Sequence, residues 1–216
     1  MIQRNQGGAS LVDGQVELML HRRMYYDDHW GVEEALDEPG NDGQGLVVRG
    51  KHWLILEPAA SSQKDQRKLA LEMFHQPIVT FSLFQPGPKN SILTDFSGLL
   101  KQLPENIHVL TLKRLSESSV LLRLEHFLQN GDDTSLAQPA VVDLDQIFST
   151  LDVLSVEELL LAANARTGNR KDMPLSWNRP SNILTGSGRE RFAVQLQPME
   201  IKTLLLEVRY RKPSEK

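Results

Sequence analysis

The residues best suited to chemistry lie between positions 21 and 30, where histidines, arginines and aspartates are concentrated. Histidine and carboxylate side chains can bind zinc or transfer protons, and an arginine fork can donate several hydrogen bonds to a carboxylate or a sugar hydroxyl. The candidates are His21, Arg22, Arg23, Asp27, Asp28 and His29. The preceding residues alternate between apolar and polar, so the pattern predicts a β-strand whose end carries these groups.

We do not expect this stretch to hold a complete metal site. His21 and His29 would lie about 25 Å apart on an extended strand, at about 3.3 Å per residue. The chain has no cysteine and no His-Glu-x-x-His motif, which removes thiolate ligands and the helix-borne zinc pair. The sequence therefore predicts no metal ligand, and no cofactor, on this chain.

The motifs also predict no catalytic nucleophile. A Gly-x-Ser-x-Gly elbow is absent, and the lack of cysteine closes the thiolate route. Adjacent carboxylates on a strand point to opposite faces and rarely share a proton. We therefore interpret three such pairs as solvated turns or strand edges: Asp27–Asp28, Asp132–Asp133 and Glu157–Glu158.

A second cluster of polar residues lies in the stretch 121–133. Arg123 and Glu125 would share one face of a strand, with His126 on the other. Arg123 and Glu125 could form a lateral ion pair, which stabilises little when exposed. A sheet edge is the favoured interpretation.

Alternating apolar residues, typical of half-buried strands, are the dominant pattern of the chain. Clusters rich in Gly, Asn, Asp and Pro separate these runs and suit turns. The predicted strands are 15–22, 45–57 (one strand, or two broken at Gly50), 77–84, 107–115, 119–128, 139–144 and 194–211, with 107–115 and 119–128 forming a hairpin.

One helix is predicted strongly, over residues 61–76. Its opening serines can cap the first turn, its apolar residues recur at helical spacing, and Pro77 would end it. Residues 144–151 could add one helical turn. The polar stretch 165–190 is predicted to be a long loop anchored by Trp177. Short strands with little helix predict an all-β sandwich.

The composition excludes several classes of protein. The 216 residues are enough for one large domain or two small ones, and residues 1–45 look separable from residues 46–216. A net charge of −4 with dispersed Lys and Arg argues against a nucleic-acid surface. No apolar run approaches the roughly 18–20 residues of a membrane span. The first ten residues contain no apolar core of a signal peptide, so none is predicted.

One long segment, GGASLVDGQVELMLHRRMYYDDHWGVEEALDE (7–38), carries a distinctive pattern that continues along the chain. It is followed by GLVVRGKHWLIL (45–56), FSGLLKQLPENIHVLTL (96–112), SVLLRLEHFLQNGDDTSLAQPAVVDLDQIFST (119–150) and LQPMEIKTLLLEV (196–208). In order and spacing these segments resemble the C-terminal portion of the lysosomal-type α-mannosidases, glycoside hydrolase family 38.

The resemblance implies a place within a zinc-dependent retaining hydrolase that removes α-linked mannose from N-glycans and oligosaccharides. The family's nucleophile and zinc ligands belong to an N-terminal α/β domain, so this chain is expected to be inactive alone. Residues 1–45 would be the last strands of a β-supersandwich, and residues 46–216 the final β-sandwich. The implied partners are the N-terminal catalytic portion and mannose-containing glycans, and the implied compartment is the lysosome.

The resemblance also bears on the stretch that begins at His21. In the family this strand returns toward the catalytic cleft, which implies that Arg22 or Arg23 contributes to the sugar-binding pocket beside Asp27 and Asp28. The alternative is that the Arg–Asp cluster supports a domain interface. This chain departs from the family pattern by its bulkier, more aromatic residues from Met24 to Trp30.

Two functions follow from these observations. The chain is either the C-terminal part of an α-mannosidase, or a standalone, non-catalytic β-sandwich that binds carbohydrate or a partner protein. Strands cut from a larger sandwich leave open edges and an apolar face. In the first case the catalytic portion covers them, and in the second a partner or a rearrangement of residues 1–45 must do so.

Overall fold

The computed structural model describes residues 7–83, 94–145, 147–167, 183–184 and 192–211. Its contacts divide the chain into two compact units. The first contains Met1–Pro58 and Asp65–Pro77, and the second contains Ala59–Lys64 and Ile78–Lys216. The predicted boundary after residue 45 stays a prediction.

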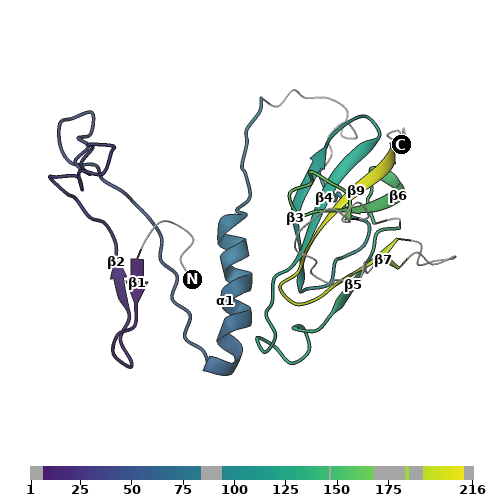
Figure 1. The fold of residues 1–216 in the computed structure, drawn as a ribbon, viewed down its shortest axis with the longest axis horizontal. Helices are drawn as coiled ribbons and strands as arrows, with labels where there is room; N and C mark the ends of the chain where they lie inside the picture. The colour runs from purple at the N-terminus through teal and green to yellow at the C-terminus, as the bar shows by residue number, and fades with distance from the viewer. Residues whose placement is uncertain (1–6, 84–93, 146, 168–182, 185–191, 212–216) are drawn as a thin grey trace. The chain divides into compact units, whose positions relative to one another are not determined.

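The second unit contains two antiparallel sheets (Figure 1). One has the strand order β3-β4-β9-β6 and the other β5-β8-β7. The strands are β3 Ile107–Arg114, β4 Ser119–His126, β5 Ala140–Asp143, β6 Leu151–Leu159, β7 Ile183–Leu184, β8 Ala193–Leu196 and β9 Ile201–Tyr210. The predicted all-β sandwich is confirmed.

The core of the sandwich follows from the period of two in its strands. Leu122 of β4 lies directly opposite Leu204 of β9, and both side chains are fully buried. Val142 of β5 and Val194 of β8 belong to the same apolar cluster. Burying a leucine or valine side chain fully contributes about 1.5–3 kcal/mol relative to exposure. This cluster therefore holds the two sheets together.

The predicted β3–β4 hairpin is confirmed, and so is β5. The predicted final strand, 194–211, is instead two strands in different sheets. A turn separates them, in which the Glu200 N–H donates to the Gln197 carbonyl (2.9 Å) and Met199 has a φ of 61°. The sequence pattern continues through this turn, so alternation alone did not reveal it.

Strand β6 was not predicted, and the helical turn expected at 144–151 is wrong. The described residues of that stretch contain no helix, and β6 begins at Leu151. β6 contains adjacent polar residues, and its register against β9 shifts between Val153 and Ser155. The long loop predicted at 165–190 contains β7, which pairs with β8. Trp177 lies outside the described residues.

The sheet-edge interpretation of Arg123 is also wrong, because β4 lies between β3 and β9. Arg123 donates to the Leu161 carbonyl through Nε (3.3 Å) and Nη2 (3.2 Å). The Thr203 hydroxyl donates to the same carbonyl at 3.2 Å. Glu125 faces His108 at 3.5 Å rather than Arg123. The segment after β6 is thereby fastened over the outer face of the sheet.

Asp132 and Asp133 lie in a turn that their carboxylates stabilise by hydrogen bonds, rather than in the solvated turn that the sequence predicts. The Asp132 carboxylate is buried and accepts the Gln129 N–H at 2.8 Å. Asp133 Oδ1 accepts the N–H groups of Ser135 and Leu136, each at 2.8 Å, and Lys64 Nζ lies 3.1 Å from Oδ2. These donors hold the pKa of Asp133 well below its ordinary value, the backbone N–H of Leu136 first among them.

The Asp133 turn predicts a pH dependence of stability. A carboxylate whose pKa is lowered by folding stabilises the fold above the unfolded-state pKa of about 3.9 and loses this contribution as the pH falls below it. Asp133→Ala should therefore lower the melting temperature at pH 7 and make a smaller difference at pH 3. Asp133→Asn keeps an acceptor without the charge and should lie between the two. An equal loss for Asp133→Ala at both pH values would contradict this assignment. Melting followed by circular dichroism measures it.

The first unit contains a short hairpin, in which β1 (Gly7–Ala9) pairs with β2 (Glu17–Met19). Helix α1 (Ala59–Phe74) contributes residues to both units and confirms the predicted helix, although it begins two residues earlier. The predicted serine cap is wrong, because Pro58 occupies the N-cap position without a side-chain hydrogen bond. The His75 N–H donates to the Leu71 carbonyl at 2.9 Å and closes the last turn. No described helix is long and apolar enough to cross a membrane.

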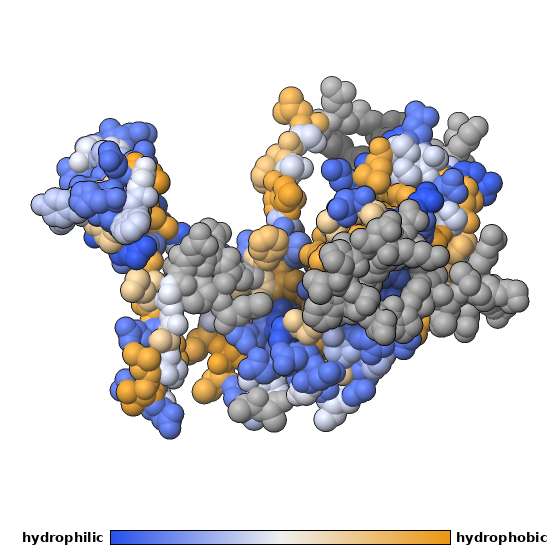
Figure 2. All heavy atoms as spheres, viewed as in Figure 1, coloured by the Kyte–Doolittle hydropathy of each residue, from blue (hydrophilic) through white to orange (hydrophobic). Residues whose placement is uncertain are grey.

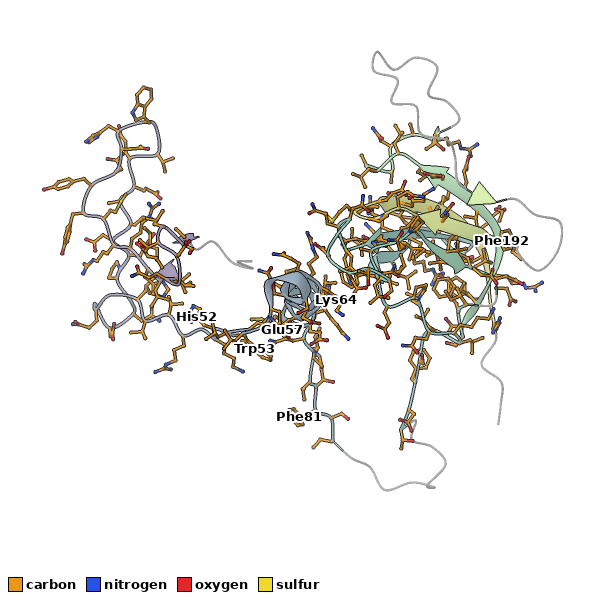
Figure 3. The ribbon with its side chains drawn as sticks, turned by 90° about the horizontal axis from the view of Figure 1, so that it is seen from below. His52, Trp53, Glu57, Lys64, Phe81 and Phe192 are labelled. Atoms are coloured by element: carbon orange, nitrogen blue, oxygen red, sulfur yellow. The ribbon has the colours of Figure 1, made fainter. Side chains whose placement is uncertain are left out.

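The strands predicted at 45–57 and 77–84 do not form in the described residues. The described residues of both stretches follow an extended path (Figure 1), and no described strand pairs with either of them. Hydrophobic residues lie on the surface of these stretches (Figure 2), and Figure 3 labels Trp53 on one and Phe81 on the other. Phe81 is 96% exposed. A β-strand requires a ladder partner for its backbone groups, which alternation of side chains cannot supply.

Candidate functional site

Residues 23–37 form a loop closed at its neck, which we call the clasped loop. The Met24 N–H donates to the Leu36 carbonyl at 3.1 Å. Immediately outside this bond, the Arg23 guanidinium forms an ion pair with the Asp37 carboxylate. The backbone bond and the ion pair together bring residues fourteen apart into contact and fix the ends of the loop.

Arg23 is engaged on two sides. The hydrogen bond that Arg23 donates to the Asp37 carboxylate, followed by the charge of that carboxylate, raises the pKa of Arg23. Its guanidinium also lies 5.4 Å from the centroid of the Tyr25 ring, a cation–π distance. Arg22 is exposed and makes no hydrogen bond or ion pair with the described part of the chain. Of the two arginines, Arg22 therefore has the freer set of donors.

Asp27 and Asp28, the two aspartates of the Arg–Asp cluster, shape the tip of the clasped loop. Asp27 accepts the His29 N–H at 3.2 Å, and Asp28 accepts the Trp30 N–H at 3.1 Å. The His29 ring nitrogen Nδ1 lies 3.3 Å from the second oxygen of Asp27. These bonds from a side chain to the backbone two residues later are Asx turns. They stabilise a tip in which His29 has a φ of 60°.

The same tip exposes three aromatic rings. Tyr25 is 71% exposed, Tyr26 is 80% exposed and Trp30 is 89% exposed. Rings of this size stabilise proteins mainly when buried, so an exposed cluster on a closed loop indicates a contact surface. We call Tyr25, Tyr26 and Trp30 the aromatic tip.

The structure brings Arg23, Asp27 and Asp28 into one loop, while Arg22 lies just outside its neck. Whether these four residues face a catalytic cleft stays a prediction. Sequence reasoning missed Asp37, the partner of Arg23. Asp37 lies at the start of the turn cluster 37–45, and only the path of the loop shows that it returns to Arg23.

The sandwich unit contains a buried polar network that the sequence did not reveal. His126 is fully buried, and its Nε2 lies 2.9 Å from the Gln138 carbonyl and 3.0 Å from the Asn106 amide nitrogen. Asn106 donates to the Leu136 carbonyl at 2.7 Å. The network fastens β4 to the segment before β5, and its burial favours a structural role.

An open hollow also lies on the sandwich, between residues 101–105 and β5. Its volume is about 550 Å³. Lys101 at its rim lies 3.7 Å from Asp143 and donates to the Asp145 carbonyl at 3.2 Å. No aromatic residue is among the described residues that line it. The hollow is therefore a poorer candidate for a binding site than the aromatic tip.

The described residues do not fit a zinc site. They contain no group of three or more histidine, aspartate or glutamate side chains that could hold a metal ion. Nothing in this part of the chain therefore assigns a zinc-dependent step to it.

Comparisons with known proteins bear on the sandwich and on the whole chain. Residues 106–204 match the model of the glycosyl hydrolases family 38 C-terminal beta sandwich domain. The chain is 37% identical to the lysosomal alpha-mannosidase of Cavia porcellus over 98% of its own length and 22% of that protein. It is 36% identical to the lysosomal alpha-mannosidase of Homo sapiens over 96% of its length and 21% of that protein.

A plant protein is also similar to this chain over nearly the whole length of the chain. A probable alpha-mannosidase of Arabidopsis thaliana is 33% identical over 95% of this chain and 22% of its own length. The chain therefore spans about a fifth of the length of the relatives that it matches.

Proposed function

The chain belongs to glycoside hydrolase family 38, and on that basis we propose that it serves as the C-terminal β-sandwich region of an enzyme that hydrolyses α-linked mannose. The observation that carries this proposal is the match of residues 106–204 to the family's C-terminal sandwich. The similarity to α-mannosidases over nearly the whole chain supports it. The proposed substrates are N-glycans and mannose-containing oligosaccharides.

The catalytic nucleophile and the zinc site are proposed to belong to an N-terminal catalytic portion. One observation supports this division of labour. The chain spans only 22% of the length of the lysosomal alpha-mannosidase of Cavia porcellus. The contribution of this chain would then be structural support and part of the substrate-binding surface.

Two exposed stretches support the N-terminal portion as the partner. Leu54 and Leu56 are 90% and 95% exposed, and Phe81 and Leu83 are 96% and 97% exposed. An extended segment with apolar side chains and no ladder partner can add to the edge of another sheet, where its backbone and its side chains are both satisfied. We propose that residues 46–56 and 78–83 pair with sheets of the N-terminal portion.

Arg22 is the residue of the motif that we propose for the sugar-binding cleft. Arg23 is already engaged by Asp37, whereas Arg22 is exposed and has free donors within the described residues. Arginine can donate to sugar hydroxyls or to an active-site carboxylate. Asp27 and Asp28 would support this position by holding the turn beside it. A lysosomal compartment is proposed from the relatives of that name.

Reconstitution tests the proposed function. The purified chain, assayed on an aryl α-mannoside with added Zn²⁺, should show no turnover alone. It should give turnover when mixed with a separately made N-terminal portion of a family 38 α-mannosidase. Changing Leu54 and Phe81 to serine should reduce the activity recovered on mixing, because both side chains are almost fully exposed and would contact the N-terminal portion.

Two outcomes would contradict the proposal. Hydrolysis by the chain alone would show that catalytic groups are present in it. A mixture without activity, combined with binding of glycans by the chain alone, would favour the standalone carbohydrate-binding module. A serine pair placed at Leu110 and Leu112 of β3 serves as the matched control, because these leucines are also exposed but lie within a paired strand.

A further inference from the structure

We infer that Asn130 is a site of spontaneous deamidation, in which the backbone nitrogen of Gly131 displaces the side-chain amide, and that hydrogen bonds of the surrounding turn set the rate. Among the asparagines of the sequence, only Asn130 is followed by glycine. Glycine has no Cβ atom, so its nitrogen is the least hindered nucleophile that can follow an asparagine. The modification needs no catalytic portion and does not rest on the proposed function.

The reacting groups protrude from a segment that is otherwise packed into the sandwich. Leu128 is fully buried and Asp132 is 7% exposed, whereas Asn130 and Gly131 between them are exposed. A Cβ atom placed on Gly131 would meet no atom within 4 Å, so the space around this residue is open. Within the described part of the chain, neither the Asn130 amide nor the Gly131 N–H makes a hydrogen bond. Solvent therefore reaches both reacting groups.

The reaction consumes water and releases ammonia. A solvent base removes the Gly131 N–H proton, and the nitrogen attacks the carboxamide carbon of Asn130. The new N–C bond closes a succinimide ring, the C–N bond to the side-chain amide breaks, and ammonia leaves with a proton from solvent. Water then opens the ring at either carbonyl, and the product is aspartate or isoaspartate at position 130. No oxidant or reductant takes part.

The turn opposes ring closure until it opens. The Asp132 N–H donates to the Gln129 carbonyl at 3.1 Å, and the Gln129 N–H donates to the Asp132 carboxylate at 2.8 Å. Gly131 has a φ of 93° and Asn130 has a negative φ, which is the pattern of a type II turn. Asn130 then has a ψ of about 120°, which directs the Gly131 nitrogen away from the Asn130 side chain. The two bonds made by Asp132 therefore slow the reaction.

Deamidation should destabilise the same turn. Isoaspartate adds a carbon to the main chain, so the bond from the Asp132 N–H to the Gln129 carbonyl cannot keep its geometry. Either product also places a new carboxylate near the buried carboxylate of Asp132, and like charges repel each other. We expect the deamidated chain to melt at a lower temperature than the fresh chain.

Peptide mapping by mass spectrometry of the folded full chain, stored at mildly alkaline pH, tests the inference. Trypsin releases residues 124–166 as a single peptide, which contains both Asn130 and the matched control Asn164. Asn164 is also exposed but precedes Ala165. Position 130 should change from amide to acid about tenfold or more faster than position 164, because the Cβ atom of alanine hinders the attacking nitrogen.

Variants of the turn test the role of Asp132. Asp132→Ala removes the acceptor of the Gln129 N–H and should speed deamidation of Asn130 by about fivefold or more, because the turn opens more often. Asp132→Asn keeps an acceptor oxygen and should lie between the parent chain and Asp132→Ala. The parent chain unfolded in urea should react faster than the folded parent. Asn130→Gln should abolish the change at this position, since glutamine would have to close a larger ring.

Three results would overturn the inference. Position 130 would keep its amide in the folded chain while it reacts in urea, position 164 would react as fast as position 130, or Asp132→Ala would react no faster than the parent. Circular dichroism checks that the variants fold. If Asp132→Ala does not fold, Asp132→Asn takes its place in the comparison, and an unchanged rate would again overturn the role of the turn.

Discussion

Replacing Leu204 with alanine should lower the free energy of unfolding of the sandwich by about 2–5 kcal/mol. Leu204 is fully buried on β9, between β4 and β6, and lies opposite Leu122. Truncation removes apolar contacts and leaves a cavity that the neighbouring strands β4 and β6 cannot fill, because the packing of the sandwich fixes their positions. Urea unfolding followed by circular dichroism measures the loss.

Leu112→Ala is the matched control for the core. Leu112 is also in the four-stranded sheet, on β3, but it is 54% exposed. Its truncation should cost about 1 kcal/mol or less, because part of the side chain already contacts water. Equal losses for the two variants would show that Leu204 does not belong to a closely packed core.

Replacing Lys202 with methionine should lower the free energy of unfolding by about 2–4 kcal/mol. The Lys202 side chain is 2% exposed, and its Nζ lies 3.5 Å from a carboxylate oxygen of Glu158, which is 17% exposed. Removing the lysine leaves the Glu158 carboxylate largely buried without its cation, and that residual charge is what destabilises the fold. Because Glu158 retains some contact with water, the expected loss lies at the lower end for a buried pair.

A double variant separates the pair from its parts. Lys202→Met combined with Glu158→Gln removes both charges and should recover most of the loss, because no unpaired ion remains. The ion pair between Arg166 and Glu157 is the matched control, at 3.1 Å and with both side chains more exposed. Arg166→Met should cost about 0–1 kcal/mol. A double variant less stable than Lys202→Met would contradict the assignment.

The fold class could be predicted because it depends on local patterns. The hairpin of β3 and β4, strand β5 and helix α1 each have a period or a boundary that can be read within a short window. Alternation of apolar residues predicts that one face of a segment is buried. It does not report whether a partner strand is present, so the stretches 45–57 and 77–84 match the pattern of strands without forming them.

For strand β6 the error was the reverse: the strand forms, but the sequence pattern did not predict it. Its adjacent carboxylates weaken the alternation, yet the strand forms because it pairs with β9 at eight positions and because the Lys202 ammonium group forms an ion pair with Glu158. Pairing with a strand more than forty residues away along the chain is a tertiary interaction. No local window of sequence contains it.

The sequence by itself determined the β-sandwich class, the resemblance to family 38 and the concentration of Arg, Asp and aromatic residues after residue 20. Only the tertiary structure decided what those residues do in this chain. Arg23 is held by Asp37, Asp27 and Asp28 bond to the backbone of the tip, and Arg22 and Trp30 remain exposed. The physical reason is that a side chain's role depends on which groups reach it and on how much water it loses. Both depend on the path of the whole backbone rather than on neighbouring residues.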